Sequence, residues 1–397
     1  DNISPNHPVI FRRIDGHAAW ANSLAMKLAG ISSQTEDITG GIILRDESGN
    51  PNGIFIDNAM ELIETKIPPT TKKDIRRYLE KAQSLLNTLG ITSIHDAGTS
   101  KEEIEVMKEM ISSNDLSLRV YTMLHNNPDD YEDFLKSGPE TENPFIKVQA
   151  VKLYMDGALG SRGAALLEPY SDDLNNKGLL IISADEHESL VQKLSKAGFQ
   201  SNTHGIGDRA VRTILDSYEK MANFSSRNRI EHAQIVHPDD IPRFKELNVI
   251  PAMQSTHCTS DMYWADERLG NHRLNEAYAW QSLIKSGVVV PAGSDAPVEF
   301  PDPLVGIYAA VTRQDKKGWP KNGWQKHERM TLEQAIKSYT EWAAYASFEE
   351  DIKGKIELGF YADFTVLDRE LLSHNPLEIL NSTVIYTIIN GKIVYQK

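Results

Sequence analysis

Four side chains that can bind a metal ion follow apolar, strand-like segments of the chain. The run 145–151 leads into Lys152, and later apolar segments lead into His204, His232 and Asp295. Imidazole nitrogens and carboxylate oxygens are ligands for zinc and related cations. The carboxyl ends of parallel strands meet at one mouth of a barrel, so these positions predict a metal site there. A carboxylate such as Asp295 can both bind a cation and accept a proton from water.

Lys152 needs a separate explanation, because an ammonium at the end of a buried strand is costly unless it is paired or neutralised. One interpretation is a lysine that reaches solvent or pairs with Asp156. The other is a lysine whose nitrogen has reacted with carbon dioxide. The resulting carbamate is an oxygen ligand that can bridge two divalent cations about 3.5–4 Å apart.

A parallel sheet must position these residues. From residue 91 onward, strand-like segments alternate with helical segments of roughly 10–20 residues, a pattern typical of right-handed crossovers. Seven strands are predicted, near residues 91, 116, 147, 200, 229, 249 and 288. A closed (β/α)₈ barrel has eight strands, so we expect an α/β fold with a TIM-like barrel whose first strand is missing.

Two further segments differ from the barrel pattern. A strand near 8–13, a helix near 18–28 and a hairpin near 41–56 are expected before the barrel strands. At the other end, short strands and a hairpin turn at Asn390-Gly391 predict a small β module that needs additional strands. The expected domains are a barrel over residues 1–350, built from strands 2–8 with a rim insertion near 31–70, and the C-terminal part of a β-sandwich over 351–397.

Composition limits the classes of partner that are expected for this chain. The net charge of −14 disfavours nucleic acid and anionic membrane, which need basic patches, but it says nothing positive about the substrate. A small-molecule substrate is the expected partner. No stretch is long and apolar enough to span a bilayer. The single cysteine, Cys258, excludes an internal disulfide and is expected to be a buried thiol. A homodimer is compatible with the sequence. The chain opens at Asp1 without a methionine or a signal pattern. The compartment is unknown: a cytoplasmic one is favoured, and a signal peptide lost with a missing N-terminal segment is the alternative.

The motifs together resemble the YtcJ-like branch of the amidohydrolase superfamily, amidohydrolase family 3. The resemblance covers nearly the whole chain in order. It implies a metal-dependent TIM-barrel hydrolase, with a β-sandwich built from both chain ends, that cleaves C–N bonds of amides, formamides and related cyclic compounds, often with zinc. The matching segments are 15–20 (DGHAAW), 151–162 (VKLYMDGALGSR), 204–208 (HGIGD), 229–234 (RIEHAQ), 293–297 (GSDAP) and 359–368 (GFYADFTVLD).

The resemblance also implies roles for individual residues. Lys152 would be the carboxylated lysine, His204 and His232 would be metal ligands, and Asp295 would be both ligand and catalytic base. One or two divalent ions, most simply zinc, would be bound. The family carries a His-x-His pair at the end of the first barrel strand, which this sequence lacks. Because every later family segment is present, we expect an N-terminal portion to be missing.

Five residues stand in segments that resemble the family's pocket loops, and each is a candidate substrate contact. They are His17, Arg162, His257, Asp261 and Arg273. An arginine can hold a substrate carboxylate through a bidentate pair. His257 is the strongest candidate because its segment directly follows a predicted strand. For each of the five, a solvated or structural ion pair is the alternative interpretation.

The expected function is hydrolysis of a non-peptide, amide-like C–N bond. A metal-activated hydroxide would attack the carbonyl, and Asp295 would take up the proton and pass it to the leaving nitrogen. A second interpretation is a catalytically impaired metal or small-molecule binding protein lacking barrel strand 1. A third, a barrel enzyme without metal, requires four coincidences at strand ends. Histidine, aspartate and carbamate ligands suit zinc, manganese, iron or cobalt, so the metal stays open, as does the substrate.

Overall fold

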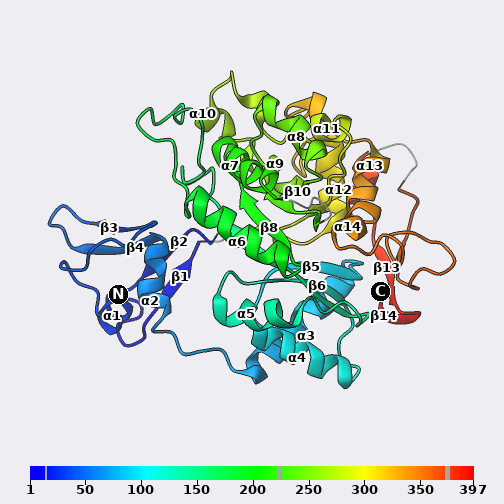
Figure 1. The fold of residues 1–397 in the computed structure, drawn as a ribbon, viewed down its shortest axis with the longest axis horizontal. Coiled ribbons are helices and arrows are strands. Elements are labelled where there is room, and N and C mark those ends of the chain that lie inside the picture. The colour runs from blue at the N-terminus through cyan, green and yellow to red at the C-terminus, as the bar shows by residue number, and fades with distance from the viewer. Residues whose placement is uncertain (14–15, 222–225, 372–375) are drawn as a thin grey trace.

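The computed structural model describes residues 1–13, 16–221, 226–371 and 376–397. These residues form a four-stranded, a seven-stranded and a three-stranded sheet (Figure 1). The seven-stranded sheet is the centre of the molecule, and helices cover its outer face. In the described ranges, no helix combines the length and the apolar character needed to cross a bilayer.

The central sheet contains all seven predicted barrel strands, and neighbouring strands are parallel. Their spatial order equals their chain order. Within the described part of the chain, β5 and β11 each pair with one strand, so the sheet is a curled, open TIM-like barrel. The strands are β5 (Ser93–Thr99), β6 (Arg119–Leu124), β7 (Ile146–Tyr154), β8 (Gln200–Gly205), β9 (Arg229–His232), β10 (Ile250–Gln254) and β11 (Ala292–Gly293).

The last strand is much shorter than the predicted apolar run at 288–295. Only Ala292 and Gly293 pair with β10. Pro291 directly precedes them and has no backbone N–H to give to a ladder, which limits the strand.

Helices connect the strands as predicted, and side-chain caps explain where two of them begin. Ser100 with Glu103, and Ser183 with Glu186, form capping boxes at the starts of α4 and α6. The segment from Leu332 to Ala346 forms two helices, α13 and α14. The helices around the barrel are α3 (Lys72–Thr88), α4 (Lys101–Ser112), α5 (Pro128–Ser137), α6 (Ala184–Lys196), α7 (Asp208–Glu219), α8 (Ile241–Glu246), α9 (Ser255–Asp261), α10 (Ala265–Leu269), α11 (Trp280–Lys285), α12 (Pro303–Thr312), α13 (Leu332–Ser338) and α14 (Glu341–Ala346).

Strand β7 shows how the sheet directs side chains to two different environments. Val151 and Leu153 are fully buried in the large apolar core. Successive side chains of a strand point to opposite faces, so Lys152 lies on the other face of the sheet, the face that carries Ala150. Ala150 packs in a separate small cluster with Tyr121 and Met123 of β6. Lys152 is therefore inside the barrel.

The N-terminal region is a separate antiparallel sheet with its own small core. Its strands, in the order β1-β2-β4-β3, are β1 (Ile10–Arg12), β2 (Ala18–Ala21), β4 (Pro51–Asp57) and β3 (Gly41–Arg45). Phe55 and Ile43 are buried between this sheet and the following helical turns. The hairpin prediction is confirmed by the pairing of β3 with β4.

The helix predicted near 18–28 is wrong at its start. Residues 18–21 form β2, which pairs with both β1 and β4. Helix α1 (Ser23–Leu28) begins only after Asn22, whose side chain accepts a hydrogen bond from the backbone N–H of Ala25. Asp15, in the motif just before β2, lies outside the described residues.

The C-terminal module is a three-stranded antiparallel sheet, β12 (Phe364–Leu367), β13 (Val384–Ile389) and β14 (Lys392–Gln396). Asn390 and Gly391 have φ values of 51° and 74°, which fit the predicted hairpin turn. The module lies against the end of α3, where Thr387 Oγ1 donates to the Asn87 carbonyl at 2.6 Å. The domain boundary at residues 350/351 stays a prediction.

A buried ion pair joins this module to the barrel. Arg119, the first residue of β6, is 2% exposed, and it forms two hydrogen bonds with Asp363, just before β12. The Arg119 Nε–Asp363 Oδ2 distance is 2.6 Å and the Nη2–Oδ1 distance is 2.9 Å. The guanidinium also lies 3.9 Å from the ring centroid of Tyr361. This bidentate contact fixes the module on the amino-terminal end of the barrel.

Removing one partner of this ion pair should destabilise the protein strongly, because the other charge stays buried. We expect Asp363→Ala to lower the free energy of unfolding by about 3–5 kcal/mol, measured by urea denaturation. Glu333→Ala, which removes the exposed i,i+4 partner of Lys337, is the control and should change the free energy of unfolding little. Equal effects of the two substitutions would contradict this account of the module's attachment.

Candidate metal centre

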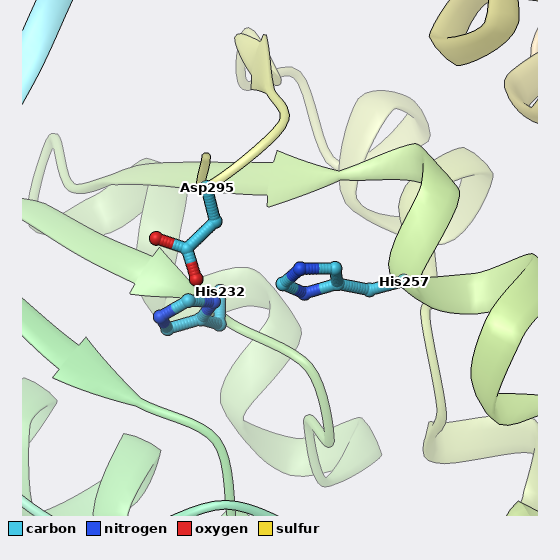
Figure 2. A group of neighbouring side chains, drawn as sticks. All are labelled: His232, His257 and Asp295. Carbon is cyan, nitrogen blue, oxygen red and sulfur yellow. The ribbon is translucent and has the colours of Figure 1, made fainter. Parts of the chain in front are cut away.

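Three side chains of metal-ligand type converge at the carboxyl ends of neighbouring strands (Figure 2). His232 ends β9, His257 lies in α9 directly after β10, and Asp295 follows β11 by two residues. Their candidate ligand atoms all lie within 4.8 Å of one another. Two of the three were predicted as metal ligands, whereas His257 was predicted as a substrate contact.

The two imidazoles of this cluster present free nitrogens in the neutral form. His232 Nδ1 lies 2.7 Å from Gln254 Oε1, an acceptor, so Nδ1 carries the hydrogen and Nε2 the lone pair. His257 Nε2 is buried and has no hydrogen-bond partner among the described residues. Burial lowers the pKa of His232 to about 3 and also lowers the pKa of His257. Neutral imidazole is the form that binds a metal.

Asp295 supplies the negative charge of the cluster. Burial raises its pKa, but the proximity of His232, His257 and Lys152 lowers it by more, so the pKa lies below that of an ordinary aspartate. The carboxylate is therefore ionised at neutral pH. Its backbone has a φ of 56°, in the left-handed region that a non-glycine residue rarely adopts, directly after the short strand β11.

His204, at the end of β8, lies beside the cluster. Its ring centroid is 4.5 Å from that of His232, and its Nε2 is buried without a hydrogen-bond partner among the described residues. Burial lowers its pKa well below the ordinary value, as do the nearby His232 and Lys152. His204 thus offers a third neutral imidazole, with its unpartnered nitrogen 3.6 Å from Asp156 Oδ1.

Asp156 holds together the backbone around His204. It is fully buried and accepts hydrogen bonds from the backbone N–H groups of Ala165, Ile206 and Gly207, at 2.8, 3.0 and 2.8 Å. Burial raises its pKa to about 7, although the three donors oppose the shift. The segments approach closely enough that a Cβ on Gly207 would lie 2.0 Å from the Ala165 carbonyl oxygen, so glycine is required there.

Lys152 is 4% exposed, and its Nζ lies 4.4 Å from the ring centroid of Tyr154. The ion pair with Asp156 that was one interpretation is not formed, and the hydrogen bonds of Asp156 come from backbone donors. The charge of Lys152 lies near enough to His204 and His232 to lower the pKa of both. The structure therefore brings all four predicted metal ligands to one region.

The N-terminal sheet contributes His17 to this region. The His17 ring centroid is 5.8 Å from that of His204, and its Nδ1 is 2.8 Å from Asp57 Oδ1. Although residue 17 precedes β5 by more than seventy residues in sequence, it reaches the mouth of the barrel. Its predicted contact with substrate stays a prediction.

The remaining predicted substrate contacts have partners within the protein. Arg162 forms a bidentate pair with Asp172, at 3.1 and 2.8 Å. Arg273 is 4% exposed and donates to the carbonyls of Leu269, Glu168 and Pro169. Both guanidinium groups thus direct their hydrogen bonds to these partners rather than to the metal cluster. For both arginines, these contacts match the alternative interpretation, in which the side chain has a structural role within the protein.

Asp261, the last residue of α9, likewise has protein partners. Its Oδ2 accepts hydrogen bonds from Gln234 Nε2, at 3.1 Å, and from the Tyr278 hydroxyl. Burial raises its pKa to about 7. It lies one helical turn after His257.

Sequence reasoning gave no role to Gln254 or Asp57, and it considered Asp156 only as an ion-pair partner of Lys152. Gln254 and Asp156 both belong to motifs that were singled out, next to His257 and Lys152. A polar residue at the end of a buried strand was the available signal for both. Asp57 gave no signal, because it lies 40 residues from its partner His17.

Comparison with known proteins shows which family the chain belongs to. The chain belongs to the amidohydrolase family, whose model matches residues 1–395. YtcJ of Bacillus subtilis, an amidohydrolase by name, is 33% identical over 403 residues, which cover 100% of this chain and 76% of that protein. The N-substituted formamide deformylase of Arthrobacter pascens is 26% identical over 415 residues, covering 100% and 75%.

A solved structure of a hydrolase also resembles this chain. An uncharacterized metal-dependent hydrolase from Pyrococcus horikoshii superposes with a TM-score of 0.78 at 28% identity, covering 94% of this chain and 74% of that one. The predicted family and the TIM-like fold are thus confirmed, and the chain is a member of a hydrolase family. A divalent metal is implied by this likeness.

The donors present fit such an ion. In the cluster of His232, His257 and Asp295, His257 has a buried Nε2 without a partner among the described residues, His232 has its Nε2 free of Gln254, and Asp295 is ionised. His204 lies beside this cluster but is not among the three residues whose ligand atoms lie within 4.8 Å of one another. Several neutral imidazoles with a carboxylate are a donor set for zinc and similar divalent ions.

Loss of the Gln254 acceptor should weaken metal binding without removing a ligand. In Gln254→Leu, His232 loses the hydrogen bond that fixes its tautomer and ring orientation, and we expect zinc affinity to fall about 10–100-fold. Competition with a chromophoric chelator measures this. Gln192→Leu, on α6 with Glu188 as its partner, is the matched control. Unchanged affinity in Gln254→Leu would show that Gln254 has no such role.

Proposed function

We propose that this protein is a metal-dependent hydrolase of a non-peptide, amide-like C–N bond. The observation that carries the proposal is the convergence of His232, His257 and Asp295 within 4.8 Å at the barrel mouth of an amidohydrolase-family chain. The C–N bond class is supported by a relative whose name states deformylation of N-substituted formamides. An amide-like substrate is proposed from that name and from the family.

The proposed metal is zinc, in one or two ions. His204, His232 and Asp295 would hold it through two imidazole nitrogens and a carboxylate, and Lys152 would join them as a carbamate. Buried Lys152 forms no ion pair with the residues that the structure describes, which supports this modification, because carbamate formation replaces an uncompensated buried cation by an anionic ligand. His257 can complete the ligand set of a single ion, or face the substrate when Lys152 is carboxylated.

A divalent cation bound there supplies Lewis-acid polarisation of the substrate carbonyl and lowers the pKa of a water molecule. Asp295, kept ionised by its neighbours, takes up the proton of the attacking water. As the water oxygen bonds to the carbonyl carbon and the C–N bond breaks, Asp295 returns the proton to the leaving nitrogen. His257 and His17 would bind the substrate by hydrogen bonds.

Asp295→Asn should abolish the proton transfer while leaving the fold intact. We expect kcat/KM on N-substituted formamides or cyclic amides to fall about 10²–10⁴-fold, with an unchanged far-UV spectrum and melting temperature. Asp133→Asn, a surface carboxylate on α5, is the control and should retain activity. An Asp295→Asn enzyme with the wild-type rate would contradict the role of Asp295.

The state of Lys152 can be measured without turnover. Zinc-loaded protein prepared with ¹³C-labelled bicarbonate should show one carbamate signal by NMR and about one or two metal ions per chain by elemental analysis. The signal should disappear in Lys152→Ala and persist in Lys147→Ala, a lysine on the same strand. A zinc-loaded wild-type protein without the signal would remove the carbamate from the proposal.

A further inference from the structure

The turn that carries His232 has an unfavourable backbone conformation. His232 and Ala233 have φ values of 74° and 40°, so two consecutive residues with a Cβ occupy the left-handed region. Such a conformation persists only when surrounding contacts determine it. Because the same turn aims the His232 ring at Asp295 and His257, the contacts that hold it also set the geometry of the metal cluster (Figure 2).

Gln234, the residue after Ala233, makes two of the contacts that hold this turn. Its carbonyl accepts the backbone N–H of Tyr278 at 2.7 Å, and its side-chain Nε2 donates to Asp261 Oδ2 at 3.1 Å. The Tyr278 hydroxyl donates to the same Asp261 oxygen. Gln234 and Tyr278 are 4% and 3% exposed, so these hydrogen bonds are made away from solvent.

Asp261 also connects the turn to the helix that carries His257. It lies four residues after His257 in α9, and residues at this spacing share a helix face. One carboxylate oxygen therefore joins the turn after β9, helix α9 and the segment around Tyr278. The turn after β9 carries His232, and helix α9 carries His257.

Tyr278 is itself held firmly. Arg313 is fully buried, donates from Nη1 to the Tyr278 carbonyl at 3.0 Å and lies over the rings of Trp280 and Trp324. The Tyr278 ring also packs edge-on against both tryptophans. The hydroxyl that reaches Asp261 thus comes from a fixed point of the core.

We propose that Asp261 is a positioning residue of the metal centre, which sets the separation of His232 and His257 by binding Gln234 and Tyr278. It acts through these two neighbours and contacts neither metal nor substrate. This inference rests on the proposed function. It replaces the expectation, made from the sequence, that Asp261 touches the substrate.

The test compares Asp261→Ala with Asp261→Asn in the full chain, using Zn²⁺ alone as the probe and the visible spectrum of the Co²⁺-substituted protein. Asp261→Ala removes the shared acceptor, and we expect zinc affinity to fall about 10–100-fold with an altered cobalt spectrum. Asp261→Asn keeps a carbonyl oxygen for both donors and should restore affinity to within about threefold of the wild type.

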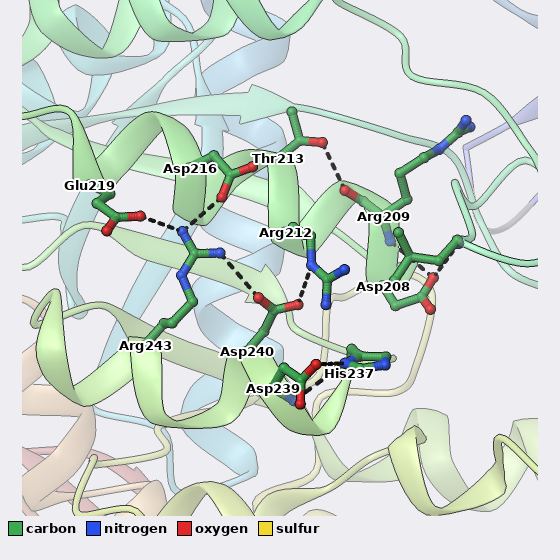
Figure 3. Close-up of polar contacts among 11 residues, drawn as sticks. Asp208, Arg209, Arg212, Thr213, Asp216, Glu219, His237, Asp239, Asp240 and Arg243 are labelled. Carbon is green, nitrogen blue, oxygen red and sulfur yellow. Dashed lines mark hydrogen bonds and ion pairs between the residues drawn. The ribbon is translucent and has the colours of Figure 1, made fainter.

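A matched control is available at another buried carboxylate. Asp240 is 2% exposed and accepts hydrogen bonds from Arg212 at 2.9 Å and Arg243 at 3.0 Å, among the outer helices (Figure 3). Asp240→Ala should lower the melting temperature and leave zinc affinity unchanged. If Asp261→Ala does not fold, Tyr278→Phe, which removes one donor only, should still weaken zinc binding measurably.

The outcomes separate the two proposals. A wild-type protein that does not bind zinc contradicts the proposed function. A wild-type protein that binds zinc, with Asp261→Ala or Tyr278→Phe binding equally well, overturns the positioning role alone. A raised KM in Asp261→Asn with unchanged zinc affinity also overturns it, because that result assigns Asp261 to the substrate.

Discussion

Parallel strands that are hydrogen-bonded in register end at a common edge, and the position of every candidate ligand depends on this constraint. Tyr154 pairs with His204, Gly205 with His232, and Gln254 with Gly293, so the ends of β7 to β11 lie side by side. Residues separated by more than a hundred positions in sequence thereby meet in one volume. The helices and the small sheets matter to the site because they keep these strand ends fixed.

Burial and charge act in opposite directions within that volume, and their balance differs between groups. Burial keeps the imidazoles of His204 and His232 neutral by lowering their pKa values. At Asp295 burial would raise the pKa, but the proximity of His232, His257 and Lys152 outweighs burial. At Asp156, three backbone donors do not fully offset burial. Unprotonated nitrogens and an ionised carboxylate thus coexist at neutral pH, as the binding of a metal cation requires.

The sequence predicted the barrel strands because buried parallel strands are almost continuously apolar, and it predicted the strand-end residues because polar side chains interrupt those runs. It could not predict β2, since Ala18–Ala21 becomes a strand through pairing with β4, more than thirty residues away. Nor could it predict the hydrogen bonds of Arg273, because two of its carbonyl acceptors lie at residues 168 and 169, more than a hundred positions away. The grouping of His257 with Asp295 arises from the helix that begins directly after β10, a tertiary feature that periodicity does not encode.

The ion pair between Arg119 and Asp363 has a consequence for the order of folding. The two residues are separated by 244 positions, so during synthesis the guanidinium of β6 emerges long before its carboxylate. Until residue 363 has been made, β6 can enter the sheet only with a buried charge that is unpaired, or with Arg119 still in water. We therefore expect this end of the sheet to become fully ordered only after the segment that begins the small C-terminal sheet has been made, and the two sheets to unfold together.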